Sequence, residues 1–180
     1  TLISFEMDAD WHEELKMLRA DFTPSVFSDT VKCDIQFGSI DRATRNDDSV
    51  QRAQFEICAH KYVNLDGDDY GLALLNRCKY GHKVKEGMLS LALLRSPVFP
   101  DPECDRGKHH IGYALYPHKD SFDSSDVIAK SYRYNNPVIL HKSDAALPSI
   151  ATCDKDNIII ETVKVAESES GIILRAYEAN

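Results

Sequence analysis

The chain has 180 residues, of which 43% are hydrophobic and 28% charged, so it can bury one sizeable core and does not have the composition of a disordered chain. Its net charge of −8 would repel a phosphate backbone, and its Lys and Arg residues stand singly, so we expect no nucleic-acid partner. No apolar run approaches the roughly 20 residues of a membrane span, and no secretory signal is visible, so we expect neither membrane insertion nor export.

The first half of the chain consists of short alternating or apolar runs, which are typical of β-strands. Residues 12–22 are the exception, because their apolar positions fit a helix and a strand equally well. The acidic residues 66–71 resemble a calcium loop but lack its ligand pattern and closing Glu, so we expect a turn. The predicted strands cover residues 2–11, 31–37, 53–65, 71–76 and 88–94.

The second half opens with a loop over residues 96–107, where three prolines exclude a central strand. Residues 121–136 predict the one short helix, with Ser124 or Ser125 as its cap. Further strands are expected at 109–118 and within 135–149, and a hairpin at 157–180. About ten strands and one helix predict an all-β fold, a large antiparallel β-sandwich that forms a single domain over residues 1–180.

The five cysteines include no Cys-x-x-Cys pair, so the sequence predicts neither a zinc knuckle nor a disulfide framework. Cys33, Cys58 and Cys153 lie in or beside strand-like runs, where we expect them to act as small core residues. Reduced thiols favour a cytoplasmic location.

No catalytic constellation stands out from the residue patterns. His118 and Asp120 have the spacing of two metal ligands on a strand, but a lone pair is weak evidence and we expect no metal site in this chain. His109 and His110 would lie on opposite faces of a strand and could not share an ion. There is no nucleophile elbow or phosphate-binding glycine loop, and none of the 29 acids is marked as one of a glycosidase pair.

Several segments together resemble the C-terminal β-region of family 38 α-mannosidases, in the cytosolic, vacuolar and bacterial branch. The central likeness lies in YGLALLNRCKYG, LSLALLRSP and DRGKHHIGYALYPH. Their order and spacing are kept over nearly all 180 residues by DADWHEELKMLRADF, IQFGSIDRATRND, AQFEICAHKYVNL and IIIETVKVAESESGIILRAYEA.

The resemblance implies a galactose-mutarotase-like β-supersandwich that follows a separate catalytic domain. The family's nucleophile and its zinc, or a similar divalent cation, belong to that N-terminal domain, and no segment here matches their motifs. The implied function is that of the non-catalytic C-terminal domain of a retaining α-mannosidase that acts on mannose-containing oligosaccharides. We therefore expect a fragment truncated at both ends, whose partner is its own catalytic domain and whose hairpin at 150–180 leads into further strands.

The resemblance also nominates substrate-binding or interdomain residues, with no catalytic and no metal-binding residue among them. Asn76, Lys79 and Tyr80 could serve a plain turn, contact the catalytic domain or contact a sugar, and these alternatives stay open. Arg95 could orient groups near the active site or be a surface residue at a strand end. His109, where the family motif is altered, is the fifth candidate.

Two departures from the family pattern bear on substrate preference: residues 42–50 read RATRNDDSV, and Arg77 stands where the family has Asp. A free-standing carbohydrate-binding sandwich is the rival interpretation. Such modules display a platform of exposed aromatic residues, and Trp11 is the only Trp here.

Overall fold

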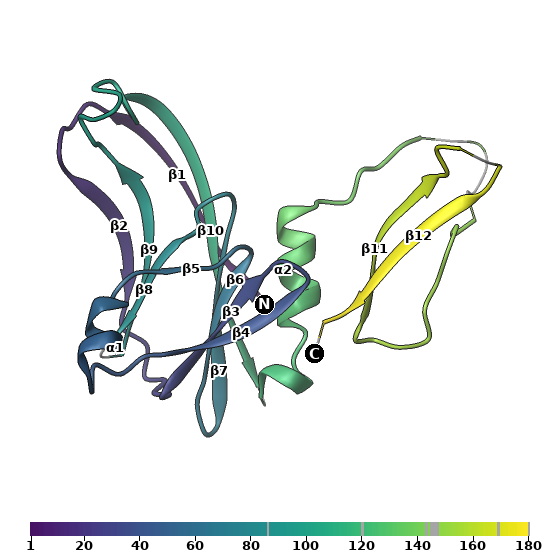
Figure 1. Cartoon of the computed structure of the whole chain (residues 1–180), viewed down its shortest axis with the longest axis horizontal. Coiled ribbons are helices and arrows are strands. Elements are labelled where there is room, and N and C mark those ends of the chain that lie inside the picture. The colour runs from purple at the N-terminus through teal and green to yellow at the C-terminus, as the bar shows by residue number, and fades with distance from the viewer. Residues whose placement is uncertain (86, 120, 143, 145–147, 169, 180) are drawn as a thin grey trace.

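The computed structural model describes residues 1–85, 87–119, 121–142, 144, 148–168 and 170–179. Two antiparallel sheets pack face to face, and a helix and a separate hairpin lie to one side of them (Figure 1). The predicted all-β antiparallel sandwich is therefore confirmed. The strands are β1 (Ile3–Trp11), β2 (Met17–Phe22), β3 (Thr30–Ile35), β4 (Gly38–Ala43), β5 (Ile57–Cys58), β6 (Tyr62–Asp66), β7 (Tyr70–Asn76), β8 (Gly81–Lys85), β9 (Met88–Arg95), β10 (Gly107–Lys119), β11 (Ile158–Val165) and β12 (Ile172–Glu178).

The larger sheet has six strands in the order β1-β10-β7-β6-β3-β4, and the smaller has four in the order β2-β9-β8-β5. Strand β10 spans 13 residues and pairs with β1 on one side and β7 on the other. Strand β7 belongs to the large sheet and β8 to the small one, so the chain passes between the sheets at the β7–β8 connection. This connection follows Asn76 and contains Lys79 and Tyr80.

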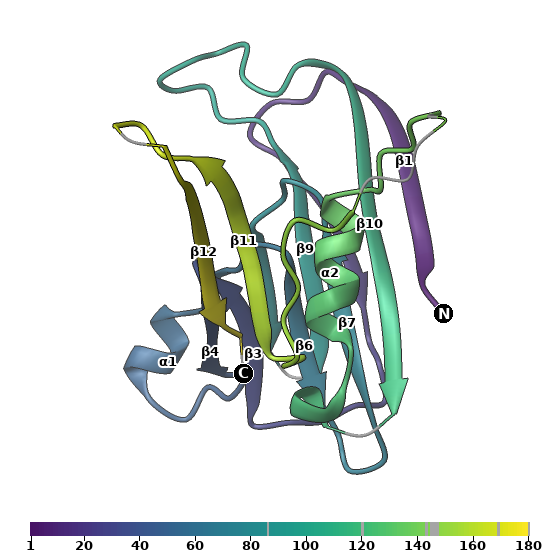
Figure 2. The ribbon, with the colours of Figure 1, turned by 90° about the vertical axis from the view of Figure 1, so that its right-hand side faces the viewer.

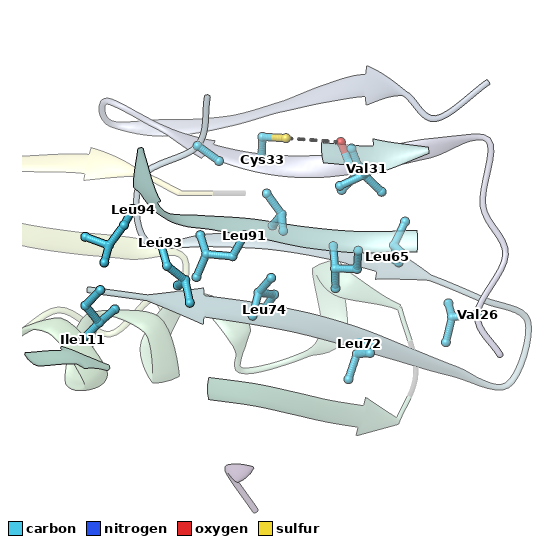
Figure 3. Close-up of a cluster of buried hydrophobic side chains, with 14 residues drawn as sticks. Val26, Val31, Cys33, Leu65, Leu72, Leu74, Leu91, Leu93, Leu94 and Ile111 are labelled. Carbon is cyan, nitrogen blue, oxygen red and sulfur yellow. Dashed lines mark hydrogen bonds between the residues drawn. The ribbon is translucent and has the colours of Figure 1, made fainter. Parts of the chain in front are cut away.

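The main core fills the space between the two sheets. Side chains of β7 and β9 reach toward one another there, as Figure 3 shows for Leu74 and Leu91. Each fully buried aliphatic side chain stabilises the fold by about 1.5–3 kcal/mol. The buried members are Val26, Val31, Cys33, Ala59, Val63, Leu65, Leu72, Leu74, Val84, Leu89, Leu91, Leu93, Leu94 and Ile111.

A second core lies on the opposite face of the large sheet, under α2 (Val127–Asn135) and the 3₁₀ turn η1 (Phe122–Ser124). The helix runs along β7 and β10 in Figure 2. Alternate residues of β7 therefore serve both cores, which explains its almost continuous apolar sequence. The buried members are Tyr62, Ala73, Leu75, Ala114, Tyr116, Phe122, Val127 and Tyr134.

The hairpin β11–β12 is attached to the sandwich through aromatic contacts. The Tyr132 and Tyr177 hydroxyls hydrogen-bond to each other, and Tyr132 also donates to Glu161 at 3.1 Å. The rings of Phe37 and Tyr177 meet edge to face, with centroids 5.5 Å apart. Large apolar side chains of the hairpin remain exposed, namely Val163, Val165, Ile172, Ile173 and Leu174.

Several predicted elements differ from the observed ones. Residues 12–22, which fitted a helix or a strand, contain strand β2. The strand predicted over 31–37 ends at Ile35, because Phe37 turns the chain with φ 57° and is 65% exposed. The predicted helix is present, but it begins after Asp126 rather than after a serine cap, and an unpredicted helix α1 covers Ser49–Ala53.

The strand predicted within 135–149 is wrong for the part that the structure describes, because residues 136–142 form neither helix nor strand. The apolar side chains of Val138, Ile139 and Leu140 are 80–93% exposed, since no strand pairs with this segment. The acidic stretch 66–71 is a turn, as predicted: the Gly67 N–H donates to the Tyr70 carbonyl at 3.1 Å.

All five cysteines are free thiols. Cys33 is buried as predicted, but the same prediction is wrong for Cys58 and Cys153, which are exposed. Burial raises the pKa of the Cys33 thiol to about 12. In the described part of the chain, no helix is long and apolar enough to cross a membrane.

Candidate functional site

Asn76 ends β7 and is fully buried. Its amide Nδ2 donates to the His60 carbonyl at 2.6 Å, and its Oδ1 accepts from the Lys79 backbone N–H at 3.1 Å. The side chain therefore closes the β7–β8 turn and ties it to the segment before β6. In this chain Asn76 presents no polar atom to a ligand.

His82 follows this turn on β8 and is also fully buried. Its Nε2 lies 3.3 Å from the Asn76 Nδ2, so the imidazole accepts this hydrogen bond and must be neutral to do so. Burial, with the nearby Arg19 charge as the second cause, lowers the pKa of His82 to about 3. Sequence reasoning missed this residue because His-x-Val in a short polar segment gives no signal of a core position.

Tyr80 and Lys79 are the parts of the turn that a partner can reach. Tyr80 is 47% exposed and meets the His60 ring edge to face at 5.3 Å, while Lys79 is half-buried. Burial, followed by the charge of Cys78, raises the pKa of the Tyr80 hydroxyl. The turn is thus held by the buried Asn76 side chain and presents the aromatic ring of Tyr80 on its surface.

Arg77, which departs from the family pattern, extends away from this turn to α2. Its guanidinium lies 4.3 Å from the centre of the Tyr134 ring, and its Nε donates to the Tyr134 carbonyl at 3.3 Å. Its Nη1 lies 3.2 Å from the Glu6 carboxylate. Arg77 therefore joins α2 to the large sheet.

Arg95 and His109 are brought together by Asp105, which sequence reasoning missed. The Arg95 backbone N–H donates to the Asp105 Oδ2 at 2.9 Å, and the His109 Nε2 lies 2.9 Å from the Asp105 carbonyl. Asp105, whose φ is 59°, thus contacts one residue through its side chain and the other through its backbone carbonyl. The Arg95 side chain itself is exposed at the end of β9.

The adjoining loops at this end of the sandwich are fixed to each other. The Trp11 indole N–H donates to the Ser96 hydroxyl at 2.5 Å, and the Leu15 N–H donates to the Ser96 carbonyl at 2.7 Å. An ion pair between Arg106 and Glu14 joins the same two loops. A cavity of about 400 Å³ lies among them. We call its exposed residues the end patch: Leu15, Lys16, Met17, Arg95, Val98 and Phe99.

The five predicted site residues therefore form two groups. Asn76 pairs with Tyr113 in the middle of β10, whereas His109 lies opposite Ala9 near the start of β10. The structure joins Arg95 to His109 and keeps Asn76, Lys79 and Tyr80 in a separate turn.

His118, which the sequence offered as one of a weak pair of metal ligands, lies in a buried polar cluster. The His118 Nε2 lies 2.8 Å from the Asn64 Oδ1 and 4.0 Å from the Asp66 carboxylate, while Asp120 lies outside the described residues. Within the residues described, no group of three or more His, Cys, Asp or Glu side chains could hold a metal ion. The resemblance assigns the zinc to the separate catalytic domain, so zinc ligands are not expected among these residues.

Comparisons with known proteins agree with the resemblance seen in the sequence. The family model described as "Glycosyl hydrolases family 38 C-terminal domain" matches residues 1–103. The chain is 38% identical to "Alpha-mannosidase G" of Dictyostelium discoideum over 98% of its length, and 38% identical to "Alpha-mannosidase 2C1" of Mus musculus over 99%. It spans only 17% and 18% of those two proteins.

Solved structures show the same fold. A crystal structure described as an α-mannosidase from Enterococcus faecalis V583 superposes with a TM-score of 0.85 at 18% identity, covering 99% of this chain and 22% of that one. A second family 38 structure from Enterococcus faecalis gives a TM-score of 0.82 at 17% identity, with the same coverage. The family model matches more than half of the chain, and the chain accordingly belongs to the C-terminal domain family of the family 38 glycosyl hydrolases.

Proposed function

We propose that this chain is the non-catalytic C-terminal β-domain of a retaining α-mannosidase that hydrolyses terminal α-mannosides of oligosaccharides. The observation that carries the proposal is the match to the C-terminal domain family together with relatives named α-mannosidase, of which the chain spans less than a fifth. In this proposal the reacting carboxylate and the zinc, or a similar divalent cation, are held by another part of the longer protein.

The domain's role is to support the catalytic domain through the end patch. Leu15 and Phe99 are 77% and 84% exposed, yet the loops that carry them are fixed by hydrogen bonds to Ser96 and an ion pair to Glu14. Rigid loops that hold large apolar side chains in water are typical of a surface covered by a partner. The exposed Arg95 guanidinium at the rim of the same patch could orient a carboxylate near the active site of that partner in a bidentate pair.

The β7–β8 turn is the second contact in this proposal. Tyr80 and Lys79 face the catalytic domain or a sugar, while Asn76 supports them from beneath by closing the turn. Since Asn76 is buried, its part is that of a positioning residue.

The proposal is tested by Phe99→Asp in the longer protein, assayed with an aryl α-mannoside. A charge on a covered apolar surface should lower both the melting temperature and the activity. Val50→Asp is the matched control, because Val50 is 62% exposed on α1, away from the end patch. Unchanged activity and melting temperature in Phe99→Asp would show that no domain covers this patch.

The exposed apolar residues of the hairpin β11–β12 support the proposal that the domain has further strands in the longer protein. Its apolar residues Ile172, Leu174 and Val165 are 48–74% exposed, which suits a sheet that is extended or covered by further strands. Limited proteolysis tests this: the hairpin should be cut in the isolated chain and protected in the longer protein. Equal cleavage in both would contradict it.

We also propose a cytoplasmic location, which the five free thiols support. Fractionation of cells that express the longer protein would test it. The rival function, a free-standing carbohydrate-binding module, is favoured by no observation as specific as the family match, and binding of mannose oligosaccharides by the isolated chain would revive it.

A further inference from the structure

A cationic pocket lies on the outer side of the four-stranded sheet, and none of the five predicted site residues lines it. It encloses about 500 Å³, within the range of small-molecule sites. Its walls come from α1, the loop after β4 and the strands β8 and β9. The lining residues are Asn46, Arg52, Phe55, Lys83, Lys85 and Met88.

Lys85 is the buried charge of this pocket. It is 4% exposed, and its Nζ donates to the carbonyls of Ala43 at 3.0 Å and Arg45 at 2.9 Å. An ammonium has three N–H donors, so two are used by the protein. Among the described residues no carboxylate lies within 4.0 Å of Lys85, which leaves its buried charge without an anion.

The other two cations of the pocket are also unpaired with acids in the described part of the chain. Arg52 makes one long contact, 3.4 Å from its Nη1 to the Asn46 carbonyl, and Lys83 has no ion pair. Two acids that flank α1 in the sequence are engaged elsewhere, since Asp48 caps α1 and Glu56 pairs with Arg19. Three cations with no acid among the described lining residues are unexpected in a chain of net charge −8.

Phe55 adds an apolar surface beside these charges. It is 57% exposed at the pocket wall, although it belongs to the segment predicted as a half-buried strand. An aromatic face next to cations suits a ligand that combines an acid group with the C–H face of a sugar ring. We propose that this pocket binds an anionic monosaccharide, with its phosphate or carboxylate on Arg52, Lys83 and Lys85 and its ring against Phe55.

The test is a titration of the isotope-labelled 180-residue chain followed by amide chemical shifts at fixed ionic strength. Glucose 6-phosphate and glucuronate distinguish the two acid groups, while glucose and inorganic phosphate separate the ring from the charge. We expect saturable shifts at Lys83 and Lys85 with at least one anionic sugar, weaker binding of inorganic phosphate and no saturation with glucose.

Lys83→Ala should raise the Kd by about fivefold, the effect of removing one partly exposed charge contact. Lys108→Ala is the matched control, since Lys108 is exposed on β10 and far from the pocket in sequence and sheet order, and it should leave the Kd unchanged. Shifts that do not saturate, or that are equal in Lys83→Ala and wild type, would overturn the site. Inorganic phosphate that binds as tightly as glucose 6-phosphate would overturn the part played by the ring.

Discussion

Replacing Asn76 by alanine tests whether this residue is a structural part of the β7–β8 turn. The substitution removes the donor to the His60 carbonyl and the acceptor for the Lys79 N–H, at 2.6 Å and 3.1 Å. It also removes the contact to the His82 Nε2 at 3.3 Å. Solvent water cannot replace these hydrogen bonds directly, because Asn76 is fully buried.

The expected cost follows from those contacts. A buried group left without its partner costs about 1–3 kcal/mol. His60 and Lys79 are half-buried and recover part of their hydration, so the total for Asn76→Ala is about 2–4 kcal/mol in the free energy of unfolding. In a domain of this size, that loss lowers the melting temperature by roughly 4–16 °C.

Urea unfolding followed by the fluorescence of Trp11, the only Trp, measures the effect. Asn157→Ala is the matched control: its Nδ2 makes a single bond, to Glu178 at 3.0 Å, and this bond is exposed to solvent at the start of the hairpin. It should change the free energy of unfolding by less than about 0.5 kcal/mol. If Asn76→Ala were as stable as Asn157→Ala, the β7–β8 turn would not depend on Asn76, and the assignment of Asn76 as a structural residue would be wrong.

Three further predictions follow from burial and exposure. Because the pKa of His82 is lowered to about 3, the unfolded chain binds a proton below about pH 6.5 that the folded chain does not, so the free energy of unfolding decreases as the pH is lowered. From pH 7 to pH 5 the wild type should lose up to roughly 2 kcal/mol more of this free energy than His82→Gln does. Equal losses would refute the prediction. The Cys33 thiol, buried and with its pKa raised, should react with a thiol reagent only after unfolding, whereas exposed Cys58 and Cys78 react in the native chain; rapid native labelling of Cys33 would contradict this. In the longer protein Arg95→Ala should keep its melting temperature and lose about five- to 150-fold in kcat/KM, and an unaltered kcat/KM would make Arg95 a plain surface residue.

The sequence predicted the strands that have a recognisable apolar pattern. β1 alternates polar and apolar residues, β7 and β9 are almost continuously apolar, and the hairpin β11–β12 surrounds a polar turn; each was found. Strand β8 was read as part of a polar loop, because only Val84 in Gly81–Lys85 is apolar. Its inward partner His82 is polar and becomes a core residue only through the bond to Asn76. Periodicity alone cannot reveal a strand whose buried position is polar.

The failed strand prediction within 135–149 has the opposite cause. Val138, Ile139 and Leu140 have high β propensity, yet a strand forms only where a neighbouring backbone accepts its hydrogen bonds. In the described part of this segment no neighbour does so. Cys58 and Cys153 lie in or beside strand-like runs of the sequence but are exposed, and Cys58 belongs to β5, an edge strand of the smaller sheet.

The site was predicted less well than the fold, because its contacts join distant residues. The resemblance pointed to Arg95 and His109, but nothing in their spacing indicates that Asp105 binds both. Lys85 likewise gives no sequence signal that it is buried against the Ala43 and Arg45 carbonyls. Such contacts depend on the sheet register, which the sequence does not specify for loops.

The central claim is that this chain is a supporting domain with no catalytic centre of its own, and its activity alone is the most direct test. The purified 180-residue chain is incubated with an aryl α-mannoside, with and without added zinc, beside a preparation from cells that lack it. We predict release of the aryl group at the rate of that blank in both conditions. Zinc-dependent turnover above the blank would contradict the account.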